Sequence, residues 1–245
     1  MFLLGIGPLA RWKNEQVKSL VIRLRYTFIV SIALAVILPV LVMGKAGLIV
    51  FPGIAAAAWI VLTSLQNVRD KMSQRVNGLR SLPQSFYGMT TAHIGVAVFV
   101  VGVTLSNAFS VEKDVRMAPQ KSLELGGYSF IFEGTHSVNG PNYEAEQGLV
   151  KVLKNGEQIA VLEPQKRLYR VQRMPMTEAA IDWGFTRDIY VALGEPLDNG
   201  AWSVRVYYKP FIRWIWLGGL LMVLGGLLAA TDKRYRRTAS PRPAT

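Results

Sequence analysis

Four long apolar runs constrain the fold of this 245-residue chain more than any other feature. They cover residues 27–44, 46–65, about 86–109 and about 211–230, and Arg213 is their one charged residue. A helix needs about 20 apolar residues to cross the ~30 Å hydrocarbon core of a bilayer. An arginine near a helix end can extend its charge to the interface. We therefore predict a membrane protein with about four transmembrane α-helices.

Basic residues flank these runs unevenly, and the asymmetry predicts the orientation of the chain. Five Lys or Arg residues precede the first run, four lie between the second and third, and five follow the fourth. Lys45 alone separates the first run from the second. Because cytoplasmic loops carry the excess of Lys and Arg, both termini and the 66–85 loop are predicted to be cytoplasmic. Residues 110–208 are then predicted to be extracytoplasmic.

The formal net charge of +12 arises from these membrane flanks. Residues 110–210 hold 12 Lys or Arg and 13 Asp or Glu, so the rest of the chain carries a net charge of +13. The mean hydropathy of +0.25 is also high for a globular nucleic-acid binder. The charge therefore indicates contact with membrane lipid and gives no support to a nucleic-acid partner.

The segment between the third and fourth runs has the pattern of β-structure. Apolar and polar residues alternate in 128–134, 148–164, 187–194 and 201–210. Lys154-Asn155-Gly156-Glu157 predicts a hairpin, because Asn-Gly supplies the positive φ angles of a type I′ turn. We predict a small antiparallel β-domain, either a sandwich or a partly open barrel. Residues 176–182 are expected to form a helical turn or an irregular loop.

The predicted organisation has five parts. These are a cytoplasmic or interfacial segment (1–26), three transmembrane helices (27–109), an extracytoplasmic β-domain (110–208), a fourth transmembrane helix (209–231) and a basic cytoplasmic tail (232–245). The first nine residues are apolar and precede the basic ones, which is the reverse of a signal peptide. They are expected to form an interfacial anchor or the end of a helix that begins upstream.

Few residue types remain for chemistry. The chain has no cysteine, which excludes disulfides, thiolate nucleophiles and a Cys-x-x-Cys-His haem attachment site. It has two histidines, His93 and His136. His136 lies in the β-domain and is interpreted as a surface or turn residue. Glu144 and Glu146 alternate on an expected strand without a base beside them, so no hydrolase site is predicted.

His93 is the strongest candidate for a functional residue, because it lies about 10 Å into the third predicted span. An ionisable residue at that depth points to a function. Two interpretations stay open: a ligand or proton-relay role, or a neutral imidazole that hydrogen-bonds a neighbouring helix. Gly88, Gly95 and Gly102 lie opposite it at seven-residue spacing, which favours close approach of another helix. The remaining apolar wall around the imidazole would suit a flat cofactor such as haem.

The segment 177–188 is the most unusual part of the β-domain. Trp183, Arg187 and Asp188, with Phe185, are candidates for a patch that docks a partner protein. The same side chains could instead close one end of the domain.

Five segments carry a family resemblance over most of the chain. They read GIGPLARW (5–12), SFYGMTTAHIGVAVFVVGVTLS (85–106), MTEAAID (176–182), TRDIYVALGE (186–195) and VRVYYKPFIRWIWLGGLLMVLGG (204–226). In this order they resemble the C-terminal part of the CcmF family, the haem lyase component of bacterial cytochrome c maturation. The resemblance implies a multi-pass protein of the bacterial inner membrane with residues 110–208 in the periplasm.

The resemblance also implies a cofactor and partners. Proteins of this family carry a non-covalent haem b held by two histidines, and the family's ligand in the S-F-Y-G-M-x-x-A-H-x-G block falls on His93. Their partners are small membrane subunits, a thioredoxin-like subunit, a haem chaperone and apocytochrome c. The thioether bonds form on cysteines of the apocytochrome.

One feature of the family is missing from this sequence. The tryptophan-rich WWD segment that binds incoming haem lies upstream in the family, with the other haem b ligand, and nothing here matches it. We therefore expect a split subunit, a truncated gene product or a fragment. His93 would need its partner ligand from an upstream CcmF portion, and no lyase activity is expected from the chain alone. The alternative is a membrane-anchored adaptor that docks haem chaperone or apocytochrome without binding haem.

Overall fold

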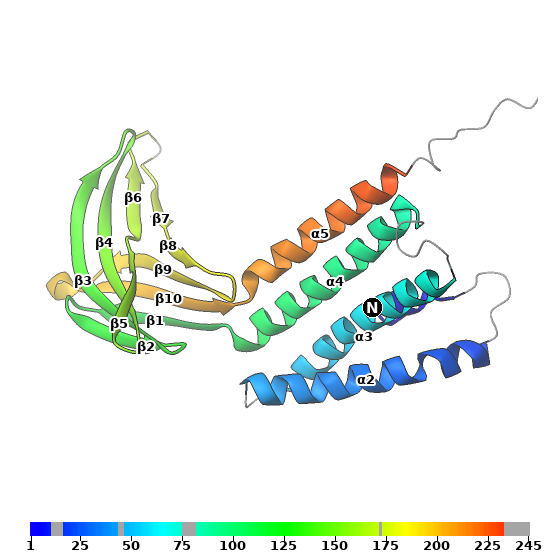
Figure 1. Cartoon of the computed structure of the whole chain (residues 1–245). Helices are drawn as coiled ribbons and strands as arrows, with labels where there is room; N and C mark the ends of the chain where they lie inside the picture. The colour runs from blue at the N-terminus through cyan, green and yellow to red at the C-terminus, as the bar shows by residue number, and fades with distance from the viewer. Residues whose placement is uncertain (11–16, 44–46, 75–81, 172, 233–245) are drawn as a thin grey trace, which may run out of the picture. The chain divides into compact units, whose positions relative to one another are not determined.

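The computed structural model describes residues 1–10, 17–43, 47–74, 82–171 and 173–232 (Figure 1). The chain divides into two compact units. A helical unit is built from the residues up to Ala108 and from Arg213 onward, and a β unit comprises Phe109–Ile212. Two separate hydrophobic clusters of buried residues accompany this division, one in each unit.

The helical unit confirms the predicted membrane helices. Its helices are α1 (Phe2–Ile6), α2 (Val17–Met43), α3 (Val50–Ser73), α4 (Gln84–Phe109) and α5 (Ile212–Ala230). In the described part of the chain, α2 to α5 are long and apolar enough to cross a membrane. Lys45, the residue expected to separate the first two spans, lies outside the described residues.

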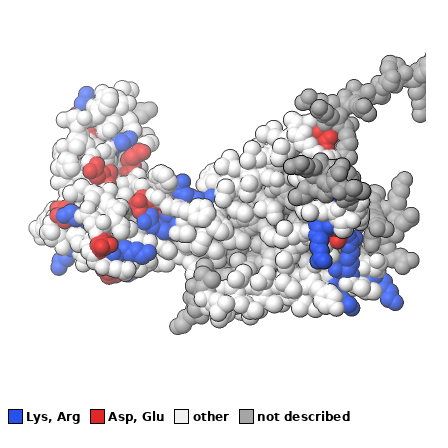
Figure 2. All heavy atoms as spheres, viewed as in Figure 1, with Lys and Arg blue, Asp and Glu red and all other residues white. Residues whose placement is uncertain are grey.

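The helix α2 is longer than the apolar run that predicted it. It begins at Val17, so residues 17–26 continue the helix. Arg23 lies in this extension, where its guanidinium pairs with the Asp70 carboxylate of α3 and donates to the Leu9 carbonyl (3.4 Å). Figure 2 shows the helical unit largely white away from its charged end, as expected for a surface that contacts lipid.

The glycine stripe of α4 packs against α5. A Cβ atom on Gly95 would lie 2.7 Å from the backbone nitrogen of Met222 and 2.8 Å from the Gly218 carbonyl oxygen. Gly88 and Gly102 are equally close to the α5 backbone, so the stripe lets two helix backbones approach without side chains between them. The prediction that this face serves close helix packing is thereby confirmed.

The ends of these two helices are also joined. The Asp232 carboxylate, which follows α5, accepts a hydrogen bond from the Ser85 backbone N–H at 2.8 Å. The Gln84 side-chain amide donates to the Thr231 hydroxyl at 3.0 Å. Asp232 therefore satisfies an N–H of the first turn of α4, which has no partner within the helix itself.

The β unit consists of two antiparallel sheets, as Figure 1 shows. The first has the order β1 (Val111–Met117), β10 (Trp202–Pro210), β9 (Arg187–Pro196), β8 (Ala180–Trp183). The second has the order β2 (Lys121–Leu125), β3 (Tyr128–Asn139), β4 (Tyr143–Lys154), β6 (Gln165–Tyr169), β7 (Pro175–Glu178), and β5 (Glu157–Leu162) pairs with β4.

The inward side chains of both sheets form one core, which confirms the predicted antiparallel β-domain. Its fully buried members include Phe130, Phe132, Val150, Val152, Ile189, Val191, Leu193, Val204 and Val206. These residues alternate with more exposed ones along their strands, as a sheet with one buried face requires. The β4–β5 hairpin turns at Asn155 (φ 52°) and Gly156 (φ 85°), the positive angles that the Asn-Gly signal predicts.

Residues 176–182 differ from the expectation. They form neither a helical turn nor an irregular loop but most of β7 and β8, which meet at Ala179. β7 pairs with β6, and β8 pairs with β9, so each strand is held by a neighbour from elsewhere in the chain. Such tertiary pairing overrides the weak local preference of an Ala-rich segment.

Candidate functional site

His93 lies in the first half of α4 and is partly buried. Its Nδ1 is 2.8 Å from the carbonyl oxygen of Met89, one turn earlier on the helix. A carbonyl oxygen can only accept, so Nδ1 must carry the proton in this hydrogen bond. The neutral imidazole then keeps its lone pair on Nε2, the arrangement found when a histidine binds a metal through Nε2.

The face of α4 that carries His93 is directed at α3. A side chain on Gly53 of α3 would overlap Thr104 of α4, so the two helices touch there. Ala97 of α4 is buried in one cluster with Ala57 and Ile60 of α3. At 100° per residue His93 lies within about 40° of Thr104 and Ala97, and the glycines packed on α5 lie on the opposite side.

These features fit an axial histidine of a haem and allow only half of a bis-histidine pair. Among the described residues, no three His, Cys, Asp or Glu side chains are grouped so that they could hold a metal ion. His136 lies on β3 in the other unit, is exposed and is paired across the sheet with Gln147, as a surface histidine should be. A second axial ligand would therefore have to come from outside the described residues.

The three residues expected at a docking patch do not share one environment. Trp183 is 69% exposed at the end of β8, whereas Asp188 is 4% exposed and accepts a hydrogen bond from the Gly184 N–H at 3.2 Å. The Arg187 guanidinium pairs with the Asp182 carboxylate and donates through Nε to the Tyr128 hydroxyl at 3.2 Å. Trp183 thus faces outward, while Arg187 and Asp188 hold the loop in place.

The protonation of Arg187 reflects this setting. Partial burial by itself would lower the pKa of Arg187, but the hydrogen bonds to Tyr128 and Asp182 outweigh it and raise that pKa. The guanidinium stays charged at every physiological pH, so its ion pair with Asp182 is a permanent part of the loop.

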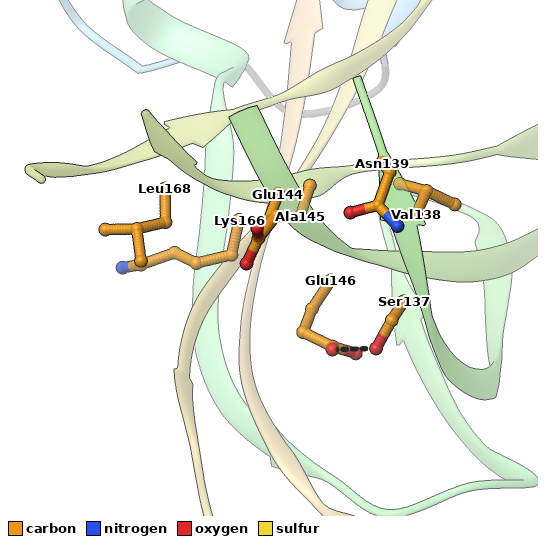
Figure 3. A pocket seen from close by; sticks show the side chains of 8 residues that line it. All are labelled: Ser137, Val138, Asn139, Glu144, Ala145, Glu146, Lys166 and Leu168. Carbon is orange, nitrogen blue, oxygen red and sulfur yellow. Dashed lines mark hydrogen bonds between the residues drawn. The ribbon is translucent and has the colours of Figure 1, made fainter. Parts of the chain in front are cut away.

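An open pocket of about 240 Å³ lies on the second sheet, where Figure 3 shows Glu144, Glu146 and Lys166 among its lining. Its carboxylates already have partners. Glu146 accepts a hydrogen bond from Ser137, and Glu144 lies 3.7 Å from the Arg170 guanidinium. Both carboxylates are thereby engaged with neighbouring polar side chains.

Three buried polar residues of α3 were not predicted from the sequence, and two of them, Ser64 and Asn67, lie on one face of the helix. Ser64 and Asn67 follow Gly53, Ala57 and Ile60 at alternating spacings of three and four, so they lie on the same face of α3. Both are almost fully buried. The seven-residue spacing of these positions in the sequence could have indicated a common helix face, but the apolar residues around them make this spacing hard to recognise.

Comparison with known proteins gives a consistent relationship. The family described as the CcmF C-terminal β-sandwich matches residues 108–210. The cytochrome c-type biogenesis protein CcmF of Pseudomonas fluorescens is 50% identical over 238 residues, which cover 96% of this chain and 36% of that protein. CcmF of Escherichia coli K12 is 43% identical over 239 residues, covering 98% of this chain and 36% of that protein.

The chain belongs to the CcmF family and corresponds to its C-terminal part. It spans only about 36% of the length of these curated relatives. A solved structure named cytochrome c haem lyase CcmF has the same fold, with a TM-score of 0.76 at 18% identity. That match covers 94% of this chain and 38% of the solved chain.

Proposed function

We propose that this chain supplies His93 as one axial ligand of a transmembrane haem b in a CcmF-type haem lyase of cytochrome c maturation. The observation that carries the proposal is the Nδ1 hydrogen bond to Met89, which leaves Nε2 available for iron. The relatives' printed names assign them to cytochrome c biogenesis. Haem b would supply one-electron redox chemistry when bound.

The residues of this chain hold and orient the ligand. The Met89 carbonyl sets the tautomer and limits rotation of the imidazole. The glycine contacts bring the backbones of α4 and α5 close together and so set the position of α4 against α5. The second ligand and the haem-binding WWD segment belong to an upstream portion of CcmF, so the lyase reaction needs that portion as well.

The ligand role is tested by haem content when this chain is produced together with an upstream CcmF portion. We expect the complex to show the absorption spectrum of a bis-histidine haem b, and His93→Ala to lose it. The matched control is His136→Ala, which changes the exposed histidine of the β-domain and should leave the spectrum unchanged. Full haem content in His93→Ala would overturn the assignment and favour the adaptor alternative.

We further propose that the chain is a multi-pass protein of the bacterial inner membrane with both termini cytoplasmic and residues 110–208 periplasmic. The charges support this orientation. The charged residues of α2 all lie before its apolar stretch, and those of α3 lie in its last five residues. The helix α4 has none. The excess of Lys and Arg thus lies on the side predicted to be cytoplasmic.

The periplasmic unit is proposed to dock maturation partners through the outer surface of β8 and the residues that follow it. Ile181, Trp183 and Phe185 are large apolar side chains exposed there. Exposed aromatic residues are enriched at protein interfaces. The partner classes are the haem chaperone, apocytochrome c and the small membrane and thioredoxin-like subunits. Arg187 and Asp188 act indirectly, because they fix the loop that presents Trp183.

A single introduced cysteine tests the orientation and the docking surface together. The chain has no cysteine of its own, and Ala179→Cys would place a thiol at an exposed position between β7 and β8. We expect a membrane-impermeant maleimide to label this thiol in spheroplasts. The extent of labelling should fall when maturation partners are co-produced, because they cover the docking surface. Adding Trp183→Ala should restore labelling.

The control for this experiment is Ser73→Cys, at the exposed end of α3. It should react only after the membrane is permeabilised. Labelling of Ser73→Cys in intact spheroplasts would contradict the orientation. Partner protection that persists in the Trp183→Ala variant would contradict the docking surface.

A further inference from the structure

The strands β1 and β2 border a hollow in the β unit. They are joined by a tight turn, in which the Lys121 N–H donates to the Ala118 carbonyl at 3.1 Å. In the described part of the chain they do not pair with each other, because β1 pairs with β10 and β2 with β3, so each strand ends its own sheet. A strand at the end of a sheet offers backbone N–H and C=O groups to another chain.

The hollow has an apolar floor. Its volume is about 550 Å³, within the range of about 300–1,000 Å³ that is usual for binding pockets. Val115, Met117 and Leu123 line it, and they belong to the core of the β unit or pack against that core. Val115 and Leu123 are only partly buried. An apolar side chain placed in the hollow would therefore complete their burial.

The rim of the hollow is positively charged. Arg116 and Lys121 line it with exposed side chains, and none of the described residues in its lining is Asp or Glu. The Arg116 guanidinium donates to the Asp198 carbonyl at 3.0 Å. A carbonyl oxygen has no formal charge, so this bond does not neutralise the guanidinium. The rim therefore favours a ligand that carries carboxylates.

The outer edge of β2 faces the same hollow. β2 and β3 are joined by a two-residue turn at 126–127, where both glycines have positive φ angles. The pair that flanks such a turn is hydrogen-bonded, and bonded and non-bonded pairs alternate from there. The backbone groups of Ser122 and Glu124 consequently point away from β3. The Lys113 ammonium agrees with this direction, since it donates to the Glu124 carbonyl at 3.5 Å, and Ser122 lines the hollow.

We propose that the outer edge of β2 and this hollow bind an extended, acidic segment of a partner polypeptide. The segment adds a strand beside β2 at Ser122, places an apolar side chain over Val115 and Leu123, and brings carboxylates to Arg116 and Lys121. A polypeptide is the occupant because only a chain with its own peptide groups can pair with a strand edge. This surface is separate from that of β8, which lies at the other end of the first sheet, and it does not depend on haem binding.

The test measures binding of synthetic peptides to the full chain in detergent by fluorescence anisotropy. The probe is a fluorescein-labelled peptide of alternating valine and aspartate. One control peptide has lysine in place of each aspartate, and a second has methylated backbone nitrogens. We expect the acidic peptide to bind at least about tenfold more tightly than either control, as the loss of one charge-assisted contact or of several backbone hydrogen bonds would cause.

Two variants and two matched controls locate the contacts. Lys121→Gln removes an exposed cation of the rim and should weaken the acidic peptide about tenfold. Ser122→Pro removes a backbone N–H that β3 does not use and should weaken it at least as much. Ser122→Ala keeps this N–H and should bind normally. Arg170→Gln removes an exposed cation beside β6, which β3 and β4 separate from β2, and should also bind normally.

Each unfavourable outcome contradicts a named part of the proposal. Equal binding of the acidic and lysine peptides, or of Lys121→Gln and the unsubstituted chain, would exclude the charge contacts. If the methylated peptide or Ser122→Pro binds as tightly as its reference, the hollow takes an acidic ligand without strand pairing and the proposal is wrong. Absence of binding by the acidic peptide would also overturn it. Lys121→Gln controls for misfolding of Ser122→Pro, because it changes only an exposed side chain.

Discussion

Gly225→Val is expected to separate α5 from α4 and to destabilise the helical unit by about 3 kcal/mol, at the upper end of the cost of over-packing. A Cβ atom on Gly225 would lie 2.5 Å from both the Ala92 nitrogen and the Gly88 carbonyl oxygen. These are backbone atoms, which cannot rotate away as a flexible side chain does. The two helices must therefore move apart at this contact.

The adjacent glycine provides the matched control. A Cβ atom on Gly226 would meet no atom within 4 Å, so Gly226→Val adds the same side chain without the overlap. Thermal unfolding of both variants in the same detergent, followed by circular dichroism, measures the difference. Equal stability of the two variants would mean that the glycine contact does not hold the helix pair together.

The effect should extend to the proposed ligand. His93 and the glycine stripe occupy opposite faces of α4, so a shift of α4 away from α5 changes the position of the imidazole relative to α3. We expect the haem content of the Gly225→Val complex to fall, whereas that of Gly226→Val should stay at the unsubstituted level.

The membrane helices were predictable because charge-free runs of about 20 residues have few other uses in a small chain. The ends of these helices were less predictable. The criterion of an apolar run placed the first span after Arg25, yet α2 begins at Val17, and Arg23 in this extension pairs with Asp70 of α3. A pairing over 47 residues has no local signature.

The same limit explains why the two short strands at residues 175–183 and the buried polar residues of α3 were not predicted. Long strands such as β3 and β4 can be predicted from the alternation of apolar and polar residues. The strands β7 and β8 have only four residues each, and they depend on neighbouring strands for pairing. His93 could be recognised from the sequence because it is an ionisable residue within a long apolar run. Asn67 could not be identified from the sequence, because only the contact between Gly53 and Thr104 shows which face of α3 is directed at α4.

Phe132→Ala is expected to cost about 3–5 kcal/mol of the stability of the β unit. Phe132 is fully buried on β3, opposite Val150 of β4 in the strand register. The change removes most of a large ring from the centre of the core, and the surrounding strands can close the space only in part. Since domains of this size have about 5–15 kcal/mol in total, the variant should be near the limit of folding.

The measurement uses residues 109–212 produced alone, which we expect to fold because they form a separate unit with its own core. Urea unfolding is followed by tryptophan fluorescence, which reports on the buried Trp202. Phe185→Ala is the control, because Phe185 is 67% exposed and its truncation should change stability by no more than about 0.5 kcal/mol. A similar loss of stability in both variants would contradict the placement of Phe132 in the core. The pair also separates stability from docking: Phe185→Ala should weaken partner binding in a domain that remains folded, so a binding defect there cannot be attributed to unfolding.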